Sequence, residues 1–227
     1  MQGTLSVVAT PIGNLGDVTL RALETLKQAD AIACEDTRVT AKLLAKYDIK
    51  KPLLIYHSQS GSLAATRILS QLGEGKHVAL VTDAGTPGIS DPGSELVSLV
   101  RERLNDTVRI EAIPGPSALT AAISIAGVPT HEFTFLGFLP HKKGRQTLMK
   151  EIAAAKRTYV FYESPHRILK ALGELSEHLP EDRKVTVLRE LTKIYESVKS
   201  GTASELLEYF EGHPKEVRGE FVVIVSR

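Results

Sequence analysis

The sequence contains no tryptophan and a single cysteine, Cys34, among its 227 residues. One cysteine cannot form a disulfide bond within the chain or supply a cysteine-rich zinc site. The seven histidines are scattered without the spacing of metal ligands, and no H-E-x-x-H motif occurs. Aromatic residues make up only 5% of the chain, which argues against a broad surface for stacking bases. We therefore expect no bound metal.

Familiar nucleotide-binding and hydrolase signatures are also missing. The chain has no G-x-G-x-x-G, no G-x-x-x-x-G-K-[ST] and no G-x-S-x-G. Its most apolar stretch, residues 118–128, is interrupted by Thr120 and Ser124 and is shorter than the ~20 residues of a membrane span. The N-terminus shows neither the basic region nor the apolar core of a signal peptide. These absences predict a cytoplasmic protein with no membrane segment.

Positive charge is concentrated in one part of a nearly neutral chain. The net charge is +1, yet residues 141–157 hold six basic residues and one acid, a segment charge of +5 against −4 elsewhere. Such a patch indicates a docking surface for an anionic partner. Composition alone is equally consistent with a solvated helix face.

Strand and helix patterns alternate through the first half of the chain. The expected strands are residues 5–10, 29–34, 52–56, 77–82 and 108–113, and the expected helices are 18–28, 38–47, 63–72, 94–104 and 117–126. Asp17 and Ser117 stand where helix caps are needed. Strands separated by helices imply a mostly parallel sheet covered on both faces.

The second half follows a turn at residues 127–130 and is less regular. Its expected strands are 133–138, 157–162, 185–189, 194–199 and 220–225, with helices at 165–179 and 204–210. Strands 185–189 and 194–199 are too close for a crossover helix, so they should pair antiparallel. We predict two α/β domains, residues 1–127 with a mostly parallel sheet and residues 128–227 with a mixed sheet.

The most informative segment is the loop at residues 83–93, which holds three glycines, two prolines and two aspartates. It lies between a predicted strand and a predicted helix, the place where α/β proteins bind small ligands. The loop has no lysine to meet phosphate. It favours a ligand that needs close backbone contact but is not a polyphosphate.

Three other polar or glycine-rich clusters also follow predicted strands, at residues 10–14, 35–38 and 114–117. The carboxyl ends of parallel strands lie at one edge of a sheet, so the four clusters should converge. Each alone has an alternative interpretation as an ordinary turn. Together they predict a ligand cleft.

Polar residues follow strands in the second half as well. Tyr162 could stack on a ring, Arg167 could reach a phosphate, and His166 could move a proton. A histidine in the first turn of a helix is more often a surface residue. Arg189 and Glu190 are better explained as an ion pair that orders the domain.

The clusters at residues 9–15, 34–38, 83–93, 114–118 and 162–167 resemble the tetrapyrrole methylase fold. Within that superfamily they are most similar to the ribosomal RNA small subunit methyltransferase I family, in order from about residue 5 to the end. The resemblance implies a homodimeric two-domain enzyme that binds S-adenosylmethionine between its domains. It implies methyl transfer to a cytidine ribose 2′-oxygen of 16S ribosomal RNA, free or in the small subunit.

The resemblance also implies a set of cofactor-binding residues. They are Pro11, Asp83, Ala84, Gly85, Ile89, Ser90, Ser117, Ala118, Tyr162, Glu163 and Arg189. A cofactor without phosphate suits a glycine loop without lysine, and a sulfonium beside a carboxylate is electrostatically favourable. The basic segment would then contact RNA phosphates through Lys142, Lys143 and Arg145, and Arg167 outside this segment would contact RNA as well.

A ribose hydroxyl is a poor nucleophile, so a base would help its attack on the sulfonium methyl. Asp36, Glu35 and Glu163 are the candidates. Asp36 is preferred, with Arg38 orienting it or clamping a phosphate. A surface pair of Glu35 with Arg38 is the alternative.

Two further functions stay open, methylation of a tetrapyrrole carbon and a non-catalytic ribosome-binding role. Some relatives continue past the equivalent of Arg227 with a short extension. If that extension grips the ribosome, this chain relies more on Lys142, Lys143 and Arg145, or it is truncated.

Overall fold

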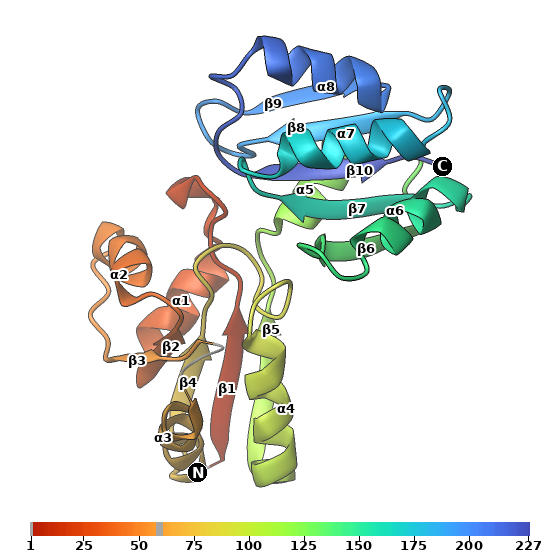
Figure 1. Cartoon of the computed structure of the whole chain (residues 1–227). Helices are drawn as coiled ribbons and strands as arrows, with labels where there is room; N and C mark the ends of the chain where they lie inside the picture. Colours follow the sequence, from red (N-terminus) through yellow and green to blue (C-terminus); the bar gives the residue numbers. More distant parts are fainter. Residues whose placement is uncertain (1, 58–60) are drawn as a thin grey trace. The chain divides into compact units, whose positions relative to one another are not determined.

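The computed structural model describes residues 2–57 and 61–227 and is shown in Figure 1. The chain divides into two compact units, residues 1–117 and residues 118–227. Each unit is built on its own five-stranded sheet. Among the described residues, no helix is long and apolar enough to cross a membrane.

The sheet of the first unit has the strand order β3-β2-β4-β1-β5, and every neighbouring pair is parallel. Its strands are β1 (Gly3–Val8), β2 (Ala31–Cys34), β3 (Leu53–Ile55), β4 (His77–Leu80) and β5 (Val108–Ile113). Its α-helices are α1 (Leu20–Gln28), α2 (Thr37–Lys46), α3 (Gly61–Gly73) and α4 (Gly93–Leu104). The predicted parallel sheet is confirmed.

Side chains on the two faces of this sheet enter two separate cores. On one face, Leu5 packs with Ile68 of α3 and Leu96 of α4. On the other face, Val8 packs with Leu26 of α1. Successive strand residues point to opposite faces, so the nearly continuous apolar strands supply both cores.

The first α-helix begins later than its sequence pattern predicts. Asn14 caps a short 3₁₀ turn at Leu15–Asp17, and α1 then starts at Leu20. Its N-cap is Thr19, whose hydroxyl accepts a 3.1 Å hydrogen bond from the Ala22 amide. Asp17 was therefore the wrong cap, because it belongs to the preceding turn.

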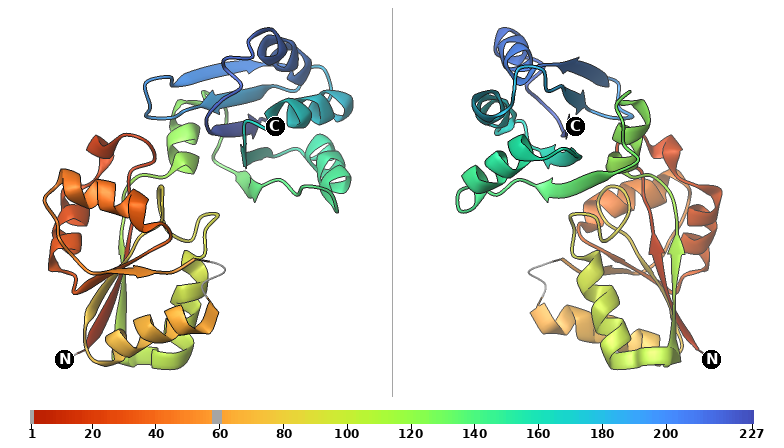
Figure 2. Two further views of the ribbon diagram at one scale, coloured as in Figure 1. Left: turned by 60° about the vertical axis from the view of Figure 1, so that its left-hand side comes forward. Right: turned by 90° about the vertical axis from the view of Figure 1, so that its right-hand side faces the viewer.

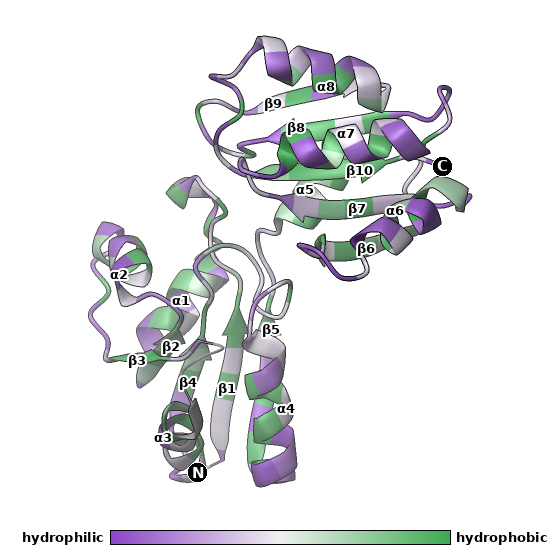
Figure 3. Cartoon of the chain, in the orientation of Figure 1, coloured by the Kyte–Doolittle hydropathy of each residue, from purple (hydrophilic) through white to green (hydrophobic). Residues whose placement is uncertain are grey.

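The sheet of the second unit has the order β6-β7-β10-β8-β9. Its strands are β6 (Phe133–Phe138), β7 (Thr158–Glu163), β8 (Val185–Arg189), β9 (Ser197–Gly201) and β10 (Phe221–Val225). Only β6 and β7 are parallel, and the other pairs are antiparallel. The predicted mixed sheet and the β8–β9 pairing are confirmed. The wholly apolar β10 lies at the sheet's centre (Figure 3).

Helices cover both faces of this second sheet. Helices α6 (Arg145–Ala154), α7 (Ile168–His178) and α8 (Ala203–Gly212) pack on one face around Phe161, Phe210 and Val223. Helix α5 (Ala118–Ile125) contacts β10 and lies on the opposite side from α7 (Figures 1 and 2). Because α5 packs on β10, it groups with the second unit, and the division falls after Ser117, before the predicted position after residue 127.

Candidate functional site

The polar clusters of the first unit lie together at the carboxyl edge of its sheet, because β2, β4, β1 and β5 are adjacent strands. Thr10 after β1 and Gly85 after β4 exchange backbone hydrogen bonds of 2.9 and 3.1 Å. After β2, the Asp36 amide donates a 3.0 Å hydrogen bond to Oδ1 of Asp83. The predicted convergence of these clusters is thus present within this unit.

Gly85 is the residue that allows the loop to approach its neighbours closely. Its φ is +88°, a conformation that other residues rarely adopt. A Cβ atom there would lie 3.3 Å from Cγ2 of Ile12 and 3.7 Å from the Pro116 carbonyl oxygen. The Thr86 hydroxyl donates to the same Pro116 oxygen at 3.0 Å. The loop backbone is therefore held against the turns that follow β1 and β5.

The two aspartates of the loop have different roles. Asp91 accepts hydrogen bonds from the amides of Gly88 (2.8 Å), Ile89 (3.2 Å) and Gly93 (2.7 Å), so it shapes the loop. Asp83 is exposed, and its Oδ2 makes no hydrogen bond within the described residues. Asp83 is thus the loop carboxylate that remains available to a ligand.

Glu35 lies beside this loop in a partly buried position. The Thr82 hydroxyl donates a hydrogen bond to its Oε1. Burial raises the pKa of Glu35 above its usual value, and the negative charges of Asp83 and Asp91 raise it further. These effects outweigh the Thr82 hydrogen bond, which lowers it. Glu35 therefore binds a proton more readily than an ordinary glutamate.

Asp36, the base preferred from the sequence, is in the opposite situation. Its carboxylate accepts hydrogen bonds from the Arg38 amide at 2.8 Å and the Arg38 Nη2 at 2.6 Å. These contacts lower the pKa of Asp36 to about 2, so it is a weak proton acceptor. Arg38, with an 86% exposed side chain, does orient Asp36 as predicted, and it pairs with Asp36 in place of Glu35.

The remaining cofactor candidates around this edge differ in exposure. Pro11 and Ser117 are buried, Ile89 and Ala118 are half-buried, and Ala84 and Ser90 are exposed. Ser90 adopts a φ of +67°, which places it in the left-handed region. The edge therefore presents a mixture of backbone, small side chains and one apolar side chain.

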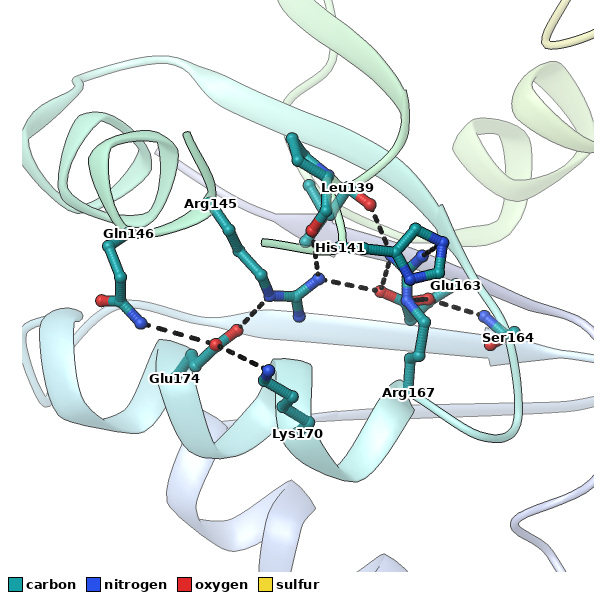
Figure 4. A network of polar contacts seen from close by, with 10 residues as sticks. Leu139, His141, Arg145, Gln146, Glu163, Ser164, Arg167, Lys170 and Glu174 are labelled. Atoms are coloured by element: carbon teal, nitrogen blue, oxygen red, sulfur yellow. Dashed lines mark hydrogen bonds and ion pairs between the residues drawn. The ribbon is translucent and has the colours of Figure 1, made fainter. Parts of the chain in front are cut away.

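In the second unit, Glu163 at the end of β7 is buried inside an ion-pair network (Figure 4). Its carboxylate accepts hydrogen bonds from Arg167 Nη2 at 3.0 Å and from the Ser164 amide at 2.8 Å, and Arg167 Nε forms an ion pair with it at 2.9 Å. Arg145 Nη1 lies 3.8 Å from the same carboxylate. Glu163 therefore neutralises two arginines inside its own unit, an arrangement that does not favour the predicted catalytic role.

The predicted contact of Arg145 with RNA is wrong, because the side chain is used inside the second unit. It is 3% exposed, and its Nε pairs with Glu174 of α7. Its Nη1 also donates to the Pro140 carbonyl at 3.1 Å (Figure 4). A guanidinium used in this way cannot meet a phosphate at the surface, so Arg145 holds α6 and the preceding loop to α7.

Arg167 is anchored by the same network. Its Nη2 donates to the Leu139 carbonyl and its Nη1 lies 3.1 Å from Nε2 of His141 (Figure 4). Residues 139–145 are thereby fixed at both ends, and Lys142 and Lys143 between these anchors are exposed. We call residues 139–143 the basic loop. Of the four predicted RNA contacts, these two lysines are the ones that the surface presents.

Arg189 is also used within the second unit. Its side chain is buried and donates to the carbonyls of Arg218 (2.8 Å) and Tyr195 (3.3 Å). The expected pairing of Arg189 with Glu190 is wrong, because Glu190 instead pairs with Lys193 at 2.8 Å. Arg189 therefore orders the loop after β8, as the structural interpretation of this segment anticipated.

Sequence reasoning missed two features of the second unit. It did not identify Glu174, which is 29 residues from Arg145 and carries no motif. It also missed an aromatic cluster in which Tyr162 contacts the rings of Phe135 and Phe138. Within the described residues, no group of three histidine, cysteine or acidic side chains is arranged to hold a metal.

Solved structures with this fold include tetrapyrrole methyltransferases. Uroporphyrin-III-C-methyltransferase from Thermus thermophilus superposes with a TM-score of 0.68 at 20% identity, over 99% of this chain and 94% of that one. The methyltransferase CobJ superposes with a TM-score of 0.73 at 21% identity, over 99% and 94%. These superpositions establish that the chain shares the fold of these enzymes.

The family model for tetrapyrrole (corrin/porphyrin) methylases matches residues 4–207. Curated relatives named ribosomal RNA small subunit methyltransferase I include proteins from Thermotoga maritima, 45% identical over 99% of this chain and 98% of the relative, and Escherichia coli O157:H7, 45% identical over 99% and 78%. The chain belongs to the tetrapyrrole methylase family, in the group of ribosomal RNA small subunit methyltransferase I.

Proposed function

We propose that this chain is an S-adenosylmethionine-dependent methyltransferase that modifies 16S ribosomal RNA of the small subunit in the cytoplasm. The finer assignment is transfer to a cytidine ribose 2′-oxygen. The observation that carries the proposal is identity of about 45% over nearly the whole chain to relatives of that name.

The strand edge of the first unit fits the cofactor. S-adenosylmethionine has no phosphate, and the loop at residues 83–93 offers no lysine. Asp83 supplies an exposed carboxylate for the sulfonium or ribose, and Ala84 beside it is exposed. Gly85 is buried, and its backbone hydrogen bonds to Thr10 hold this part of the loop in place. Ile89 supplies apolar contact for adenine. When bound, the cofactor provides the electrophilic methyl group.

Four further cofactor candidates rest on the resemblance. Pro11 and Ser117 lie at the strand edge described above, and Ala118 follows directly. Tyr162 is half-buried and offers a ring. The buried contacts of Glu163 and Arg189 favour an indirect role, in which they shape the backbone around any cofactor contact.

Glu35 is the residue we assign to accept the proton of the ribose hydroxyl. A general base works best when its pKa lies near the working pH, and burial moves the Glu35 pKa in that direction. The Thr82 hydroxyl holds the Glu35 carboxylate in place. Much of the remaining acceleration comes from aligning the ribose oxygen with the methyl group.

The basic loop is the surface we assign to RNA phosphates. Lys142 and Lys143 are exposed there, and the network around Arg145 and Arg167 holds their backbone. A positive loop of this kind supports salt-dependent binding to RNA.

A homodimer is the assembly that the resemblance implies. Exposed apolar side chains on the second unit, Ile194 at 90% and Tyr195 at 67%, support contact with a second copy. Light scattering of the purified chain tests this assembly directly.

The function is tested by offering labelled S-adenosylmethionine with unmethylated small ribosomal subunits, free 16S ribosomal RNA or a porphyrin. We expect label in RNA, recovered as 2′-O-methylcytidine after digestion. Label in the porphyrin would establish a tetrapyrrole methyltransferase instead. Bound cofactor with no transfer to any substrate would leave a non-catalytic ribosome-binding role.

A further inference from the structure

Strand β6 contains one residue more than its partner β7 between Phe135 and Phe138. Phe135 pairs with Val160 and Phe138 with Tyr162, so three steps along β6 match two along β7. Gly137, with a φ of +62°, lies in this bulge. A bulge interrupts the alternation of side chains between the two faces of a strand. Phe135 and Phe138 consequently contact the same neighbouring ring.

That ring is Tyr162, and both contacts have T-shaped, edge-on geometry. The Phe135 and Tyr162 centroids are 4.9 Å apart at 68°, and those of Phe138 and Tyr162 are 5.6 Å apart at 65°. Such arrangements are the favoured geometry for aromatic pairs. Phe138 is therefore held in a defined position by its neighbours.

Phe138 nevertheless remains largely accessible. It is 53% exposed, whereas Tyr162, whose ring it contacts, and Phe135, which contacts the same ring, are half-buried. Scattered exposed apolar side chains are normal on protein surfaces. A supported aromatic ring on an edge strand is more specific, because its orientation is already fixed.

The basic loop begins at the next residue. Lys142 lies four residues beyond Phe138, which limits the separation of their Cα atoms to at most about 14 Å. Leu139 and Pro140 between them accept hydrogen bonds from Arg167 and Arg145. The loop thus places two exposed cations beside an exposed ring on one rigid segment.

We propose that Phe138 stacks on an unpaired base of the RNA substrate while Lys142 and Lys143 contact the adjoining phosphates. The inference rests on the proposed function, because it takes RNA as the partner. Aromatic rings bind bases that are unstacked or single-stranded, and paired bases in a duplex do not present their faces. The cations beside the ring favour this anionic partner over an apolar protein surface.

The first experiment measures binding of unmethylated small ribosomal subunits by filter retention. Phe138→Ala and Phe138→Leu should each weaken binding about 5- to 150-fold, the range typical for loss of one stacked base. Phe138→Tyr should remain close to the native protein because it keeps the ring. Phe133→Ala, which removes another exposed ring from the same strand, is the matched control and should bind normally.

Stacking itself can be observed through a new tryptophan, because the chain has none. Fluorescence of Phe138→Trp should be quenched by a single-stranded RNA oligonucleotide and not by a duplex. Phe133→Trp should respond to neither. The anisotropy of labelled RNA measures binding separately.

The outcomes separate this inference from the proposed function. Native-like subunit binding by Phe138→Ala, or full rescue by Phe138→Leu, would overturn base stacking while methyl transfer by the native protein stands. Native protein that binds neither subunits nor RNA would overturn both. Binding of Phe138 to a partner protein in place of RNA would also contradict the inference.

Discussion

The two units place polar residues at equivalent positions, after the strands of a sheet, and use them differently. At the strand edge of the first unit, backbone hydrogen bonds and glycine hold the loops, so Asp83 stays exposed. In the second unit, Glu163, the last residue of β7, is buried between Arg145 and Arg167. A carboxylate that follows a strand is thus available to a ligand only where no arginine from another element neutralises it.

The largest effect on stability should follow from breaking the network of the second unit. Glu163→Gln removes the carboxylate that the buried Arg145 and the half-buried Arg167 share, and removing one partner of a buried pair costs ~3–5 kcal/mol. Urea denaturation should show that loss. Glu74→Gln, which breaks the exposed pair with Lys76, is the control and should leave stability unchanged. Equal effects would contradict a structural role for the network.

The largest effect on catalysis should follow from changing Glu35. Glu35→Gln should lower kcat by about 10²- to 10⁴-fold, the usual contribution of a general base. Native activity should fall as the pH drops through the raised pKa of Glu35, because the protonated carboxyl cannot accept a proton. A pH profile of methyl transfer checks both.

The effect of Glu35→Gln on stability should not follow its effect on catalysis. Because folding raises the Glu35 pKa, the ionised carboxylate is unfavourable in the folded state above that pKa. Glu35→Gln, which carries no charge, should therefore be at least as stable as the native protein at neutral pH, as measured by urea denaturation. Asp36→Asn should retain most activity, since Asp36, with a pKa of about 2, is a poor base. A larger catalytic loss in Asp36→Asn would reverse the assignment.

A smaller effect is expected at the glycine loop. Asp83→Ala should weaken binding of S-adenosylmethionine about 10- to 100-fold by calorimetry, since hydrogen bonds to charged groups contribute ~1.5–3 kcal/mol. Asp83→Asn separates the loss of charge from the loss of the acceptor. Unchanged affinity in both variants would remove this loop from the site.

The smallest effect should come from the basic loop. Changing both Lys142 and Lys143 to alanine should reduce the slope of log affinity against log salt by about 1.4 for single-stranded RNA. Cofactor affinity should not change. The same change at the lysine pair Lys50 and Lys51 of the first unit is the control. A salt slope that is equally reduced there would show that the loss is not specific to the basic loop.

The sequence predicted the fold better than the roles of individual side chains. Alternating apolar runs and turns identified both sheets, because the length of the connection between two strands decides whether they can pair parallel or antiparallel. The strand order was not predicted and comes from the structure. Local patterns could not show that Arg145 meets Glu174, which lies 29 residues away on another helix. They also could not rank Asp36 and Glu35, since burial and Arg38 separate their pKa values.

A crystal structure with S-adenosylhomocysteine tests the central claim most directly. We expect the adenosyl group against the backbone of residues 83–90, with the Asp83 carboxylate in contact with the ligand. A ligand bound away from Asp83 and Gly85, or no ligand bound at saturating concentration, would contradict the assignment of the first unit's strand edge as the cofactor site.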